Sequence, residues 1–333
     1  MQLVMILGIT QRSGTHFLHE LLLRHEQCIG LTSALDEDYL LAMAAPLITY
    51  EQRLVRMWPP EYKVHQHPDL LMRSLGDGLA AFLLRLSEAA REEGAPRADP
   101  EDGRERVLVT KSPSVWHLDQ AFRLFPEARI LLLVREPQAV VESGMSGFGW
   151  SFERALTGWA SGAKTIRDVQ NSELWRPDQV LLVRYEDLVS DAETELKRIF
   201  DFLDLAIGDY DFTTPDNLPV VGSSFFPVSG RGKEMWSPVV RNEKFKPLER
   251  RMVWTQRMLT RLSWTCGPYV DQFGYQLDDA SVRGSIALYH RFRGLVSSAQ
   301  RVTRITGRHA LDGVRARTGG AGWPQTSIRR MRP

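Results

Sequence analysis

Short apolar runs alternate with longer amphipathic segments along most of the chain. The apolar runs are rich in Val, Ile and Leu and have the length of a strand rather than of a helix. They cover residues 3–9, 106–110, 130–134 and 180–183. Apolar positions recur with the helical period over residues 68–92, 115–124, 152–170 and 247–263. Strands that alternate with helices predict the α/β class, with a mainly parallel central sheet flanked by helices on both faces.

The turn after the first strand has the composition of an anion-binding loop. Residues 10–16 read Thr-Gln-Arg-Ser-Gly-Thr-His, and a helical pattern follows directly. The amides of such a turn and of the helix N-terminus present positive dipoles to a ligand. Gly14 lets the backbone approach closely, Ser13 and Thr15 supply hydroxyl donors, and Arg12 supplies a fixed charge.

This loop differs from the loop that binds nucleoside triphosphates. The latter has a lysine directly after its second glycine, whereas Thr15 follows Gly14 here and the cation, Arg12, comes earlier. The strand over 130–134 ends in Arg135 and not in a carboxylate for magnesium. The pattern therefore favours an anion site that protein cations complete, without an obligatory metal. A turn rich in small residues for packing alone is the competing interpretation.

Polar residues follow the ends of the predicted strands. Arg12, Lys111, Arg135 and Tyr185 each come just after an apolar run. Because the carboxyl ends of parallel strands meet at one edge of a sheet, we expect these four side chains to converge on one crevice.

Composition restricts the class of protein. With 333 residues, 43% apolar and 25% charged, the chain is an ordinary globular protein, and one domain is the default for this class. A net charge of +1 argues against wholesale nucleic-acid binding. Cys28 and Cys266 form no disulfide framework, and neither a signal peptide nor a membrane-spanning stretch is recognisable, so we expect a cytoplasmic protein. The pair His65 and His67 is interpreted as a loop coincidence and not as a metal site.

The last part of the chain changes in composition. Residues 215–246 are rich in loop-forming residues, which is typical of binding loops and lids. We expect one domain over 1–280 and, over 281–333, a basic, arginine-rich helical extension with a disordered end. A solvated tail is the first interpretation of this extension. A site for a carrier protein or for another acidic surface is the second.

Four segments, in order along the chain, resemble the motifs of sulfotransferases that use 3′-phosphoadenosine-5′-phosphosulfate (PAPS). Residues 11–17 resemble the 5′-phosphosulfate loop in its arginine form. Residues 131–137, with Ser143 in register, resemble the 3′-phosphate motif. Residues 183–188 are similar to the Tyr-Glu-Asp segment, whose tyrosine lies beside the adenine, and residues 230–233 to the late basic loop that closes over the 3′-phosphate.

The resemblance runs from residue 3 to about 275. It implies a P-loop-like fold and in-line transfer of a sulfuryl group from PAPS to a hydroxyl of a small molecule, sugar or natural product, with adenosine 3′,5′-bisphosphate (PAP) as the product and no metal. The residues that it implies for donor binding are Arg12, Ser13, Gly14, Thr15, His16, Phe17, Arg135, Ser143, Tyr185, Arg231 and Gly232. Arg12 and Lys111 are assigned to the charge on the leaving group.

The catalytic base distinguishes branches of this family. Cytosolic small-molecule enzymes place a histidine directly after the lysine, but Ser112 follows Lys111 here. The branches that act on protein tyrosine and on sugars use a glutamate, and in the tyrosine branch it lies shortly after the first helix, so Glu37 is the predicted base. The alternatives are Asp36, Asp38, His16 and His117. In the competing interpretation, the three consecutive acids only begin a helix.

Two other functions stay open at this point. One is a P-loop nucleotide kinase or hydrolase, and the other is a non-catalytic nucleotide-binding module. Segments 45–68 and 205–245 are expected to line the acceptor pocket. The candidate walls are Trp58, Phe225, Phe226 and Trp236.

Overall fold

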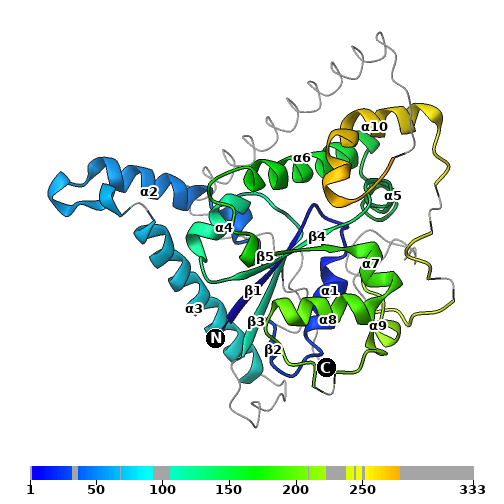
Figure 1. Ribbon diagram of the computed structural model, residues 1–333, viewed down its shortest axis with the longest axis horizontal. Helices are drawn as coiled ribbons and strands as arrows, with labels where there is room; N and C mark the ends of the chain where they lie inside the picture. The colour runs from blue at the N-terminus through cyan, green and yellow to red at the C-terminus, as the bar shows by residue number, and fades with distance from the viewer. Residues whose placement is uncertain are drawn as a thin grey trace, which may run out of the picture.

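A computed structural model describes residues 2–31, 37–67, 69–92, 106–208, 210–222, 238–243, 245–249 and 252–277. Within these residues the strands form one parallel sheet in the order β2-β3-β1-β4-β5 (Figure 1). The strands are β1 Gln2–Gly8, β2 Cys28–Ile29, β3 Val107–Ser112, β4 Arg129–Val134 and β5 Val180–Arg184. The predicted α/β class is confirmed.

Each central strand is buried on both faces. In β1, Leu3, Met5 and Leu7 belong to one core cluster, while Val4 and Ile6 belong to the other. Successive side chains of a strand point to opposite faces, so a strand covered on both sides must be apolar at every position. This is why the strands appear in the sequence as continuous apolar runs.

Helices cover both faces of the sheet (Figure 1). The face of Leu3 carries α3 Leu70–Glu92, α4 Leu118–Leu124, α5 Pro137–Phe148, α6 Phe152–Gln170 and α10 Gln256–Val270. The face of Val4 carries α1 Thr15–Leu22, α7 Tyr185–Ser190 and α8 Ala192–Phe202. The remaining α-helices are α2 Ala45–Met57 and α9 Thr214–Asn217. None of the described helices has the length and apolar content needed to cross a bilayer.

The strand order places a switch point beside β1. The chain passes from β1 outward to β2 and back to β3, and then crosses to the other side of β1 to form β4 and β5. The connections that leave β1, β3 and β4 therefore emerge at one edge, next to each other. In open α/β sheets this is where ligands bind.

Two predicted helices have different bounds. The helix predicted over 115–124 begins only at Leu118, because His117 before it has a left-handed backbone with φ 58°. The helix predicted over 247–263 is α10, which covers Gln256–Val270. Thr255 fixes its start by accepting a hydrogen bond from the amide of Met258, a typical N-cap.

Candidate active site

A cavity of about 560 Å³ lies at the carboxyl edge of the sheet. Its walls come from the loop after β1, from α1, α5 and α9, from the start of α7 and from the irregular segments 218–222 and 245–249. The predicted site residues that line it are Arg12, Gly14, Thr15, His16, Phe17, Glu37, Arg135, Ser143 and Tyr185. Of the four side chains expected to converge at the strand ends, Arg12, Arg135 and Tyr185 line this cavity and Lys111 does not.

In the loop between β1 and α1, the side chain of Ser13 bonds back to the loop's own backbone. The Ser13 hydroxyl donates to the carbonyl oxygen of Thr10 at 2.5 Å and accepts from the Thr10 amide at 3.3 Å. Arg12 and Gly14 both have positive φ, 76° and 98°. A Cβ at Gly14 would overlap the ring of Tyr185, so only glycine fits there. Ser13 thus shapes the loop with its hydroxyl, and α1 begins at the cavity wall.

Two arginines form the basic end of the cavity. Arg12 Nε donates to Ser143 Oγ at 2.9 Å, and its guanidinium lies 4.7 Å from the ring centre of Phe148. Burial, reinforced by the charge of Arg135, lowers the pKa of Arg12 to about 10. The Arg135 guanidinium lies 4.3 Å from the ring centre of Tyr185. Two cations held this close together favour an anionic ligand between or beside them.

Arg135 joins three parts of the site. One terminal nitrogen donates to the carbonyl oxygen of Arg12 at 3.2 Å, and the other donates to that of Pro247 at 3.0 Å. Its Nε is buried and has no hydrogen-bond partner among the described residues. A buried donor without a partner is costly, and a ligand oxygen would satisfy it.

His16 lines another part of the cavity and forms a pair with Lys111. Lys111 was expected just beyond its strand but lies within β3, and its side chain is fully buried. Lys111 Nζ is 2.9 Å from His16 Nδ1, and an ammonium group can only donate. Burial and the Lys111 charge lower the pKa of His16 to about 4. The imidazole is therefore neutral at pH 7, carries its proton on Nε2 and is a hydrogen-bond donor in the cavity.

The acidic segment is extended, so its interpretation as a helix start is wrong. Glu37 pairs with Lys111 in a parallel bridge, and the amide of Asp38 donates to the Lys111 carbonyl oxygen at 3.1 Å. Glu37 lines the cavity, and its Oε2 accepts from the Tyr39 hydroxyl at 2.8 Å. Alternation along extended backbone turns Asp38 away from the cavity. Asp36 lies outside the described residues.

Asp38 is held in the protein interior. Its Oδ1 accepts from the amide of Leu40 at 2.8 Å, while Oδ2 is buried and has no hydrogen-bond partner among the residues that the structure describes. Burial raises the pKa of Asp38 to about 6, against the opposing effect of the Leu40 amide. Of the two described acids of the trio, only Glu37 can meet a ligand in the cavity.

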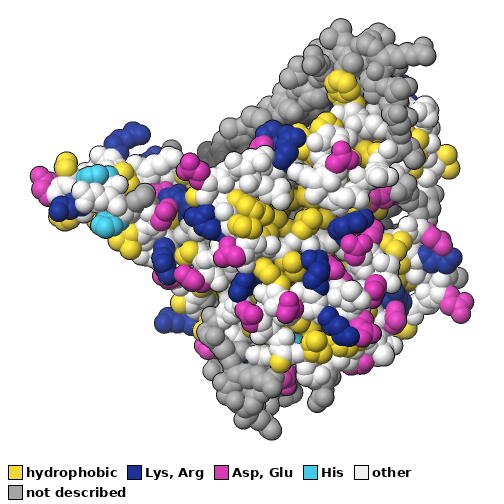
Figure 2. Space-filling model, viewed as in Figure 1, with side chains coloured by type: hydrophobic (Ala, Val, Ile, Leu, Met, Phe, Trp, Pro, Cys, Tyr) yellow, Lys and Arg dark blue, Asp and Glu magenta, His cyan; other side chains and the backbone are white. Residues whose placement is uncertain are grey.

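Several predicted positions are absent from the cavity wall. His117 precedes α4 and does not line the cavity. Trp58 is 49% exposed, and no residue of 45–67 lines the cavity, because α2 projects away from the sheet (Figures 1 and 2). The prediction of an acceptor wall at 45–68 is therefore wrong for this cavity. Phe225, Phe226, Arg231, Gly232 and Trp236 lie outside the described residues, as does the extension 281–333.

The structure adds residues that the sequence did not single out. Tyr39, Glu20, Glu142 and Arg241 line the same cavity. Glu20 stands one helical turn after His16 in α1, and this spacing could have identified it. Arg241 belongs to an irregular segment without any periodic signal. Of the segment 205–245, Pro215, 218–222 and Arg241 line the cavity, and its predicted role as an acceptor wall stays a prediction.

The model of the family described as “Sulfotransferase family” matches residues 4–209 of the chain. The protein belongs to the sulfotransferase family. Together with the parallel sheet and the β1–α1 loop, this membership confirms the predicted P-loop-like sulfotransferase fold.

Individual proteins that resemble this chain have low sequence identity to it. A Caenorhabditis briggsae protein named “Putative protein-tyrosine sulfotransferase” is 29% identical over 137 residues, which are 39% of this chain and 44% of that protein. The match thus spans less than half of that relative. Among solved structures, the sulfotransferase domain of the Synechococcus PCC 7002 olefin synthase is 20% identical, with a TM-score of 0.47, covering 83% of this chain and 96% of that one. The sulfotransferase domain of the curacin biosynthetic pathway is 18% identical, with a TM-score of 0.48, covering 83% and 99%.

Proposed function

We propose that this sulfotransferase moves the sulfuryl group of PAPS to a hydroxyl group of a small acceptor, with Glu37 as the general base. The observation that carries the proposal is the cavity, in which two guanidinium groups, the N-terminus of α1 and the Glu37 carboxylate face one space. A donor with two anionic ends needs two separated sites made of cations and amides, and an acceptor hydroxyl needs a base.

The residues present fit PAPS. The buried Nε of Arg135 has no partner within the described part of the chain. The backbone at Gly14 leaves no room for a Cβ beside Tyr185, as a close-fitting nucleotide site requires. We assign the 3′-phosphate to Arg135 and Ser143, and the 5′-phosphosulfate to the loop amides of Gly14 and Thr15. When bound, PAPS supplies the sulfuryl group.

The contact between Arg12 and Ser143 extends Arg12 toward the 3′-phosphate residues. Arg12 therefore lies between the two anionic ends, where its charge can serve both. The Arg135 guanidinium lies over the ring of Tyr185, which is the residue that the resemblance places beside the adenine. We infer that this ring orients Arg135 as well as bordering the nucleotide.

Glu37 has the position of a base. The Tyr39 hydroxyl donates to one carboxylate oxygen and fixes the orientation of the group in the cavity. The carboxylate then takes the proton of the acceptor hydroxyl as the new bond to sulfur forms. His16 cannot take this role, because the hydrogen bond from Lys111 occupies its Nδ1 and its Nε2 already carries a proton.

We assign Lys111 an indirect role, in which it acts on the bound donor through His16. Its fully buried side chain does not line the cavity, but its charge polarises the imidazole that does. The Nε2–H of His16 and the guanidinium of Arg12 would then stabilise the negative charge that grows on the leaving phosphate oxygen. This division of roles needs no metal ion. Among the residues that the structure describes, no group of three or more His, Cys, Asp and Glu side chains is suited to hold one.

The acceptor is proposed as a small molecule with a free hydroxyl. A volume of about 560 Å³ is within the range of small-molecule sites. Sugars, phenols and hydroxylated natural products all satisfy this chemistry, and a carrier-bound natural product is compatible with the basic composition of 281–333.

The test is a transfer assay. The protein is incubated with PAPS and a panel of phenols, sugars and aliphatic alcohols, and products are detected by mass spectrometry as a gain of one sulfuryl group. We expect at least one hydroxyl class to be sulfated in EDTA, with stoichiometric release of PAP. Absence of any sulfated product, together with phosphorylation from ATP and magnesium, would replace the proposal by the kinase alternative. PAP binding without any turnover would favour the non-catalytic module.

A further inference from the structure

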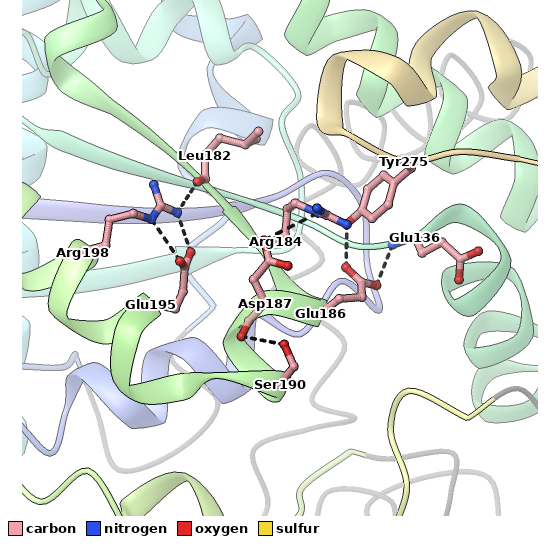
Figure 3. A network of polar contacts seen from close by, with 9 residues as sticks. All are labelled: Glu136, Leu182, Arg184, Glu186, Asp187, Ser190, Glu195, Arg198 and Tyr275. Carbon is pink, nitrogen blue, oxygen red and sulfur yellow. Dashed lines mark hydrogen bonds and ion pairs between the residues drawn. The ribbon is translucent and has the colours of Figure 1, made fainter.

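A polar network joins the ends of β4 and β5 to the C-terminal part of the described chain. The Glu186 carboxylate accepts from the backbone amide of Glu136 at 2.9 Å through Oε1 and from the Tyr275 hydroxyl at 2.7 Å through Oε2 (Figure 3). Arg184 lies on the ring of Tyr275, with 4.6 Å between the guanidinium and the ring centre. Both oxygens of Glu186 are thus engaged beside the site and not in it, since Glu186 does not line the cavity.

The amide that Glu186 holds belongs to the peptide group that follows Arg135. The carbonyl oxygen of that same peptide group accepts from Trp159 Nε1 at 2.8 Å. Trp159 of α6 and Glu186 of α7 therefore hydrogen-bond to the carbonyl and the amide of the same peptide group, and together they fix the orientation of its plane. The orientation of this plane sets the backbone dihedral angles on either side, and these determine the direction in which the Arg135 side chain leaves the strand.

We propose that Glu186, supported by Tyr275, is a positioning residue that aims Arg135 at the 3′-phosphate of the donor. The inference rests on the proposed function, because it assigns Arg135 to that phosphate. The other restraints on the Arg135 side chain are two carbonyl oxygens, which its terminal nitrogens contact, and the ring of Tyr185. Its Nε has no partner in the described residues. A guanidinium that must meet a phosphate with correct geometry gains affinity when its backbone is fixed in advance.

The network also connects two segments that lie far apart in the sequence. Tyr275 lies beyond residue 209, where the family match ends, yet it contacts the centre of the Tyr-Glu-Asp segment. A turn with φ 70° at Gly274 brings Tyr275 back onto β5 after α10. Helix α10 is thereby coupled to donor binding through one hydroxyl group.

The test is a double-mutant cycle on the dissociation constant of PAP, measured by calorimetry on the full chain. Glu186→Ala alone should weaken PAP binding about 10- to 100-fold, the scale of a lost hydrogen bond to a charged group. In an Arg135→Ala background the same change should have almost no effect, because the group that it positions is gone. Kinetically, Glu186→Ala should raise the KM for PAPS while kcat changes little.

Three further variants keep the test decisive. Glu186→Gln preserves an oxygen for the Glu136 amide and should restore binding to within a few-fold of wild type. Tyr275→Phe should reproduce a smaller part of the loss. Glu195→Ala removes a buried carboxylate of α8 that bonds Arg198 and not the Arg135 peptide, so PAP affinity should stay unchanged (Figure 3).

Additive effects of Glu186→Ala and Arg135→Ala, or equal losses in Glu186→Ala and Glu195→Ala, would overturn the positioning role. If Glu186→Ala does not fold, Tyr275→Phe replaces it in the cycle, and its smaller loss should likewise disappear in the Arg135→Ala background. A wild-type protein that does not bind PAP would instead refute the proposed function itself.

Discussion

Adjacent carboxylates in this protein have opposite environments. Glu37 faces the cavity with one oxygen hydrogen-bonded to Tyr39. Asp38 is turned inward, and one of its oxygens is buried without a partner in the described ranges. The difference follows from extended backbone, in which neighbouring side chains point to opposite sides. The place of each residue along this extended segment, and not its acidity, therefore determines which of the two carboxylates can serve as a base.

Glu37→Gln should lower turnover by ~10²–10⁴, the usual contribution of a positioned base, because an amide has the same shape but cannot accept the acceptor proton. PAP affinity should stay nearly constant. The matched change Asp38→Asn should retain most of the turnover. Steady-state kinetics with PAPS and the acceptor found in the transfer assay would check this, and a fully active folded Glu37→Gln protein would exclude Glu37 as the base.

Asp38 predicts a pH effect on stability. Its pKa rises from 3.8 in the unfolded chain to about 6 in the folded protein, so the folded state binds this proton more tightly. The resulting stabilisation is complete below about pH 4 and is lost as the pH rises through 6. At pH 7 Asp38→Asn should therefore be more stable than wild type, by an amount on the order of 2–3 kcal/mol.

Urea unfolding of both proteins at pH 5 and pH 7 measures this effect. The advantage of Asp38→Asn should shrink toward pH 5 and below. A less stable Asp38→Asn at pH 7 would mean that the ionised carboxylate has a partner that stabilises it.

Helix α6 packs closely against the backbone of the β1–α1 loop. A Cβ at Gly162 would overlap the carbonyl oxygen of Ile9, at the start of the β1–α1 loop, whereas a Cβ at Gly158 would meet Thr10 Oγ1 at an ordinary 3.6 Å. Gly162 therefore allows the helix to approach the loop backbone closely, and Gly158, one turn earlier, is not needed for this contact.

These two glycines make a matched pair. Gly162→Ala should destabilise the protein by ~1–3 kcal/mol through overpacking. Gly158→Ala should stabilise it by up to about 1 kcal/mol, because alanine has the higher helix propensity. Urea unfolding followed by circular dichroism would compare them. Equal stabilities of the two variants would show that α6 moves away from the loop at no cost.

The central strands were predictable from the sequence because burial on both faces leaves uninterrupted apolar runs, although β3 continues through Lys111 to Ser112. Arg135 and Tyr185 were predictable for the same reason, since they follow such runs directly. The start of α10 was not, because the apolar spacing of 247–255 imitates a helix and only the Thr255 cap marks its true start. Tyr39 and Arg241 lie in irregular backbone, where no period connects sequence to position.

At the scale of the whole molecule, the site depends on segments far apart in the chain. The loop after β1, the ends of β3, β4 and β5, and parts of 215–222 and 245–249 all reach one cavity, because the parallel sheet has its switch point there. The short turn alone could not distinguish a nucleotide kinase from a sulfotransferase. The arginine at the end of β4, together with the family match, makes that distinction.

The central claim is that the cavity binds a nucleotide with a 3′-phosphate through protein cations. Calorimetric titration in EDTA tests it most directly. PAP should bind and raise the melting temperature without magnesium, ATP should do much less, and Arg135→Ala should weaken PAP binding by ~1.5–3 kcal/mol. Equal stabilisation by ATP, a strict requirement for magnesium, or an unchanged dissociation constant in Arg135→Ala would contradict the claim.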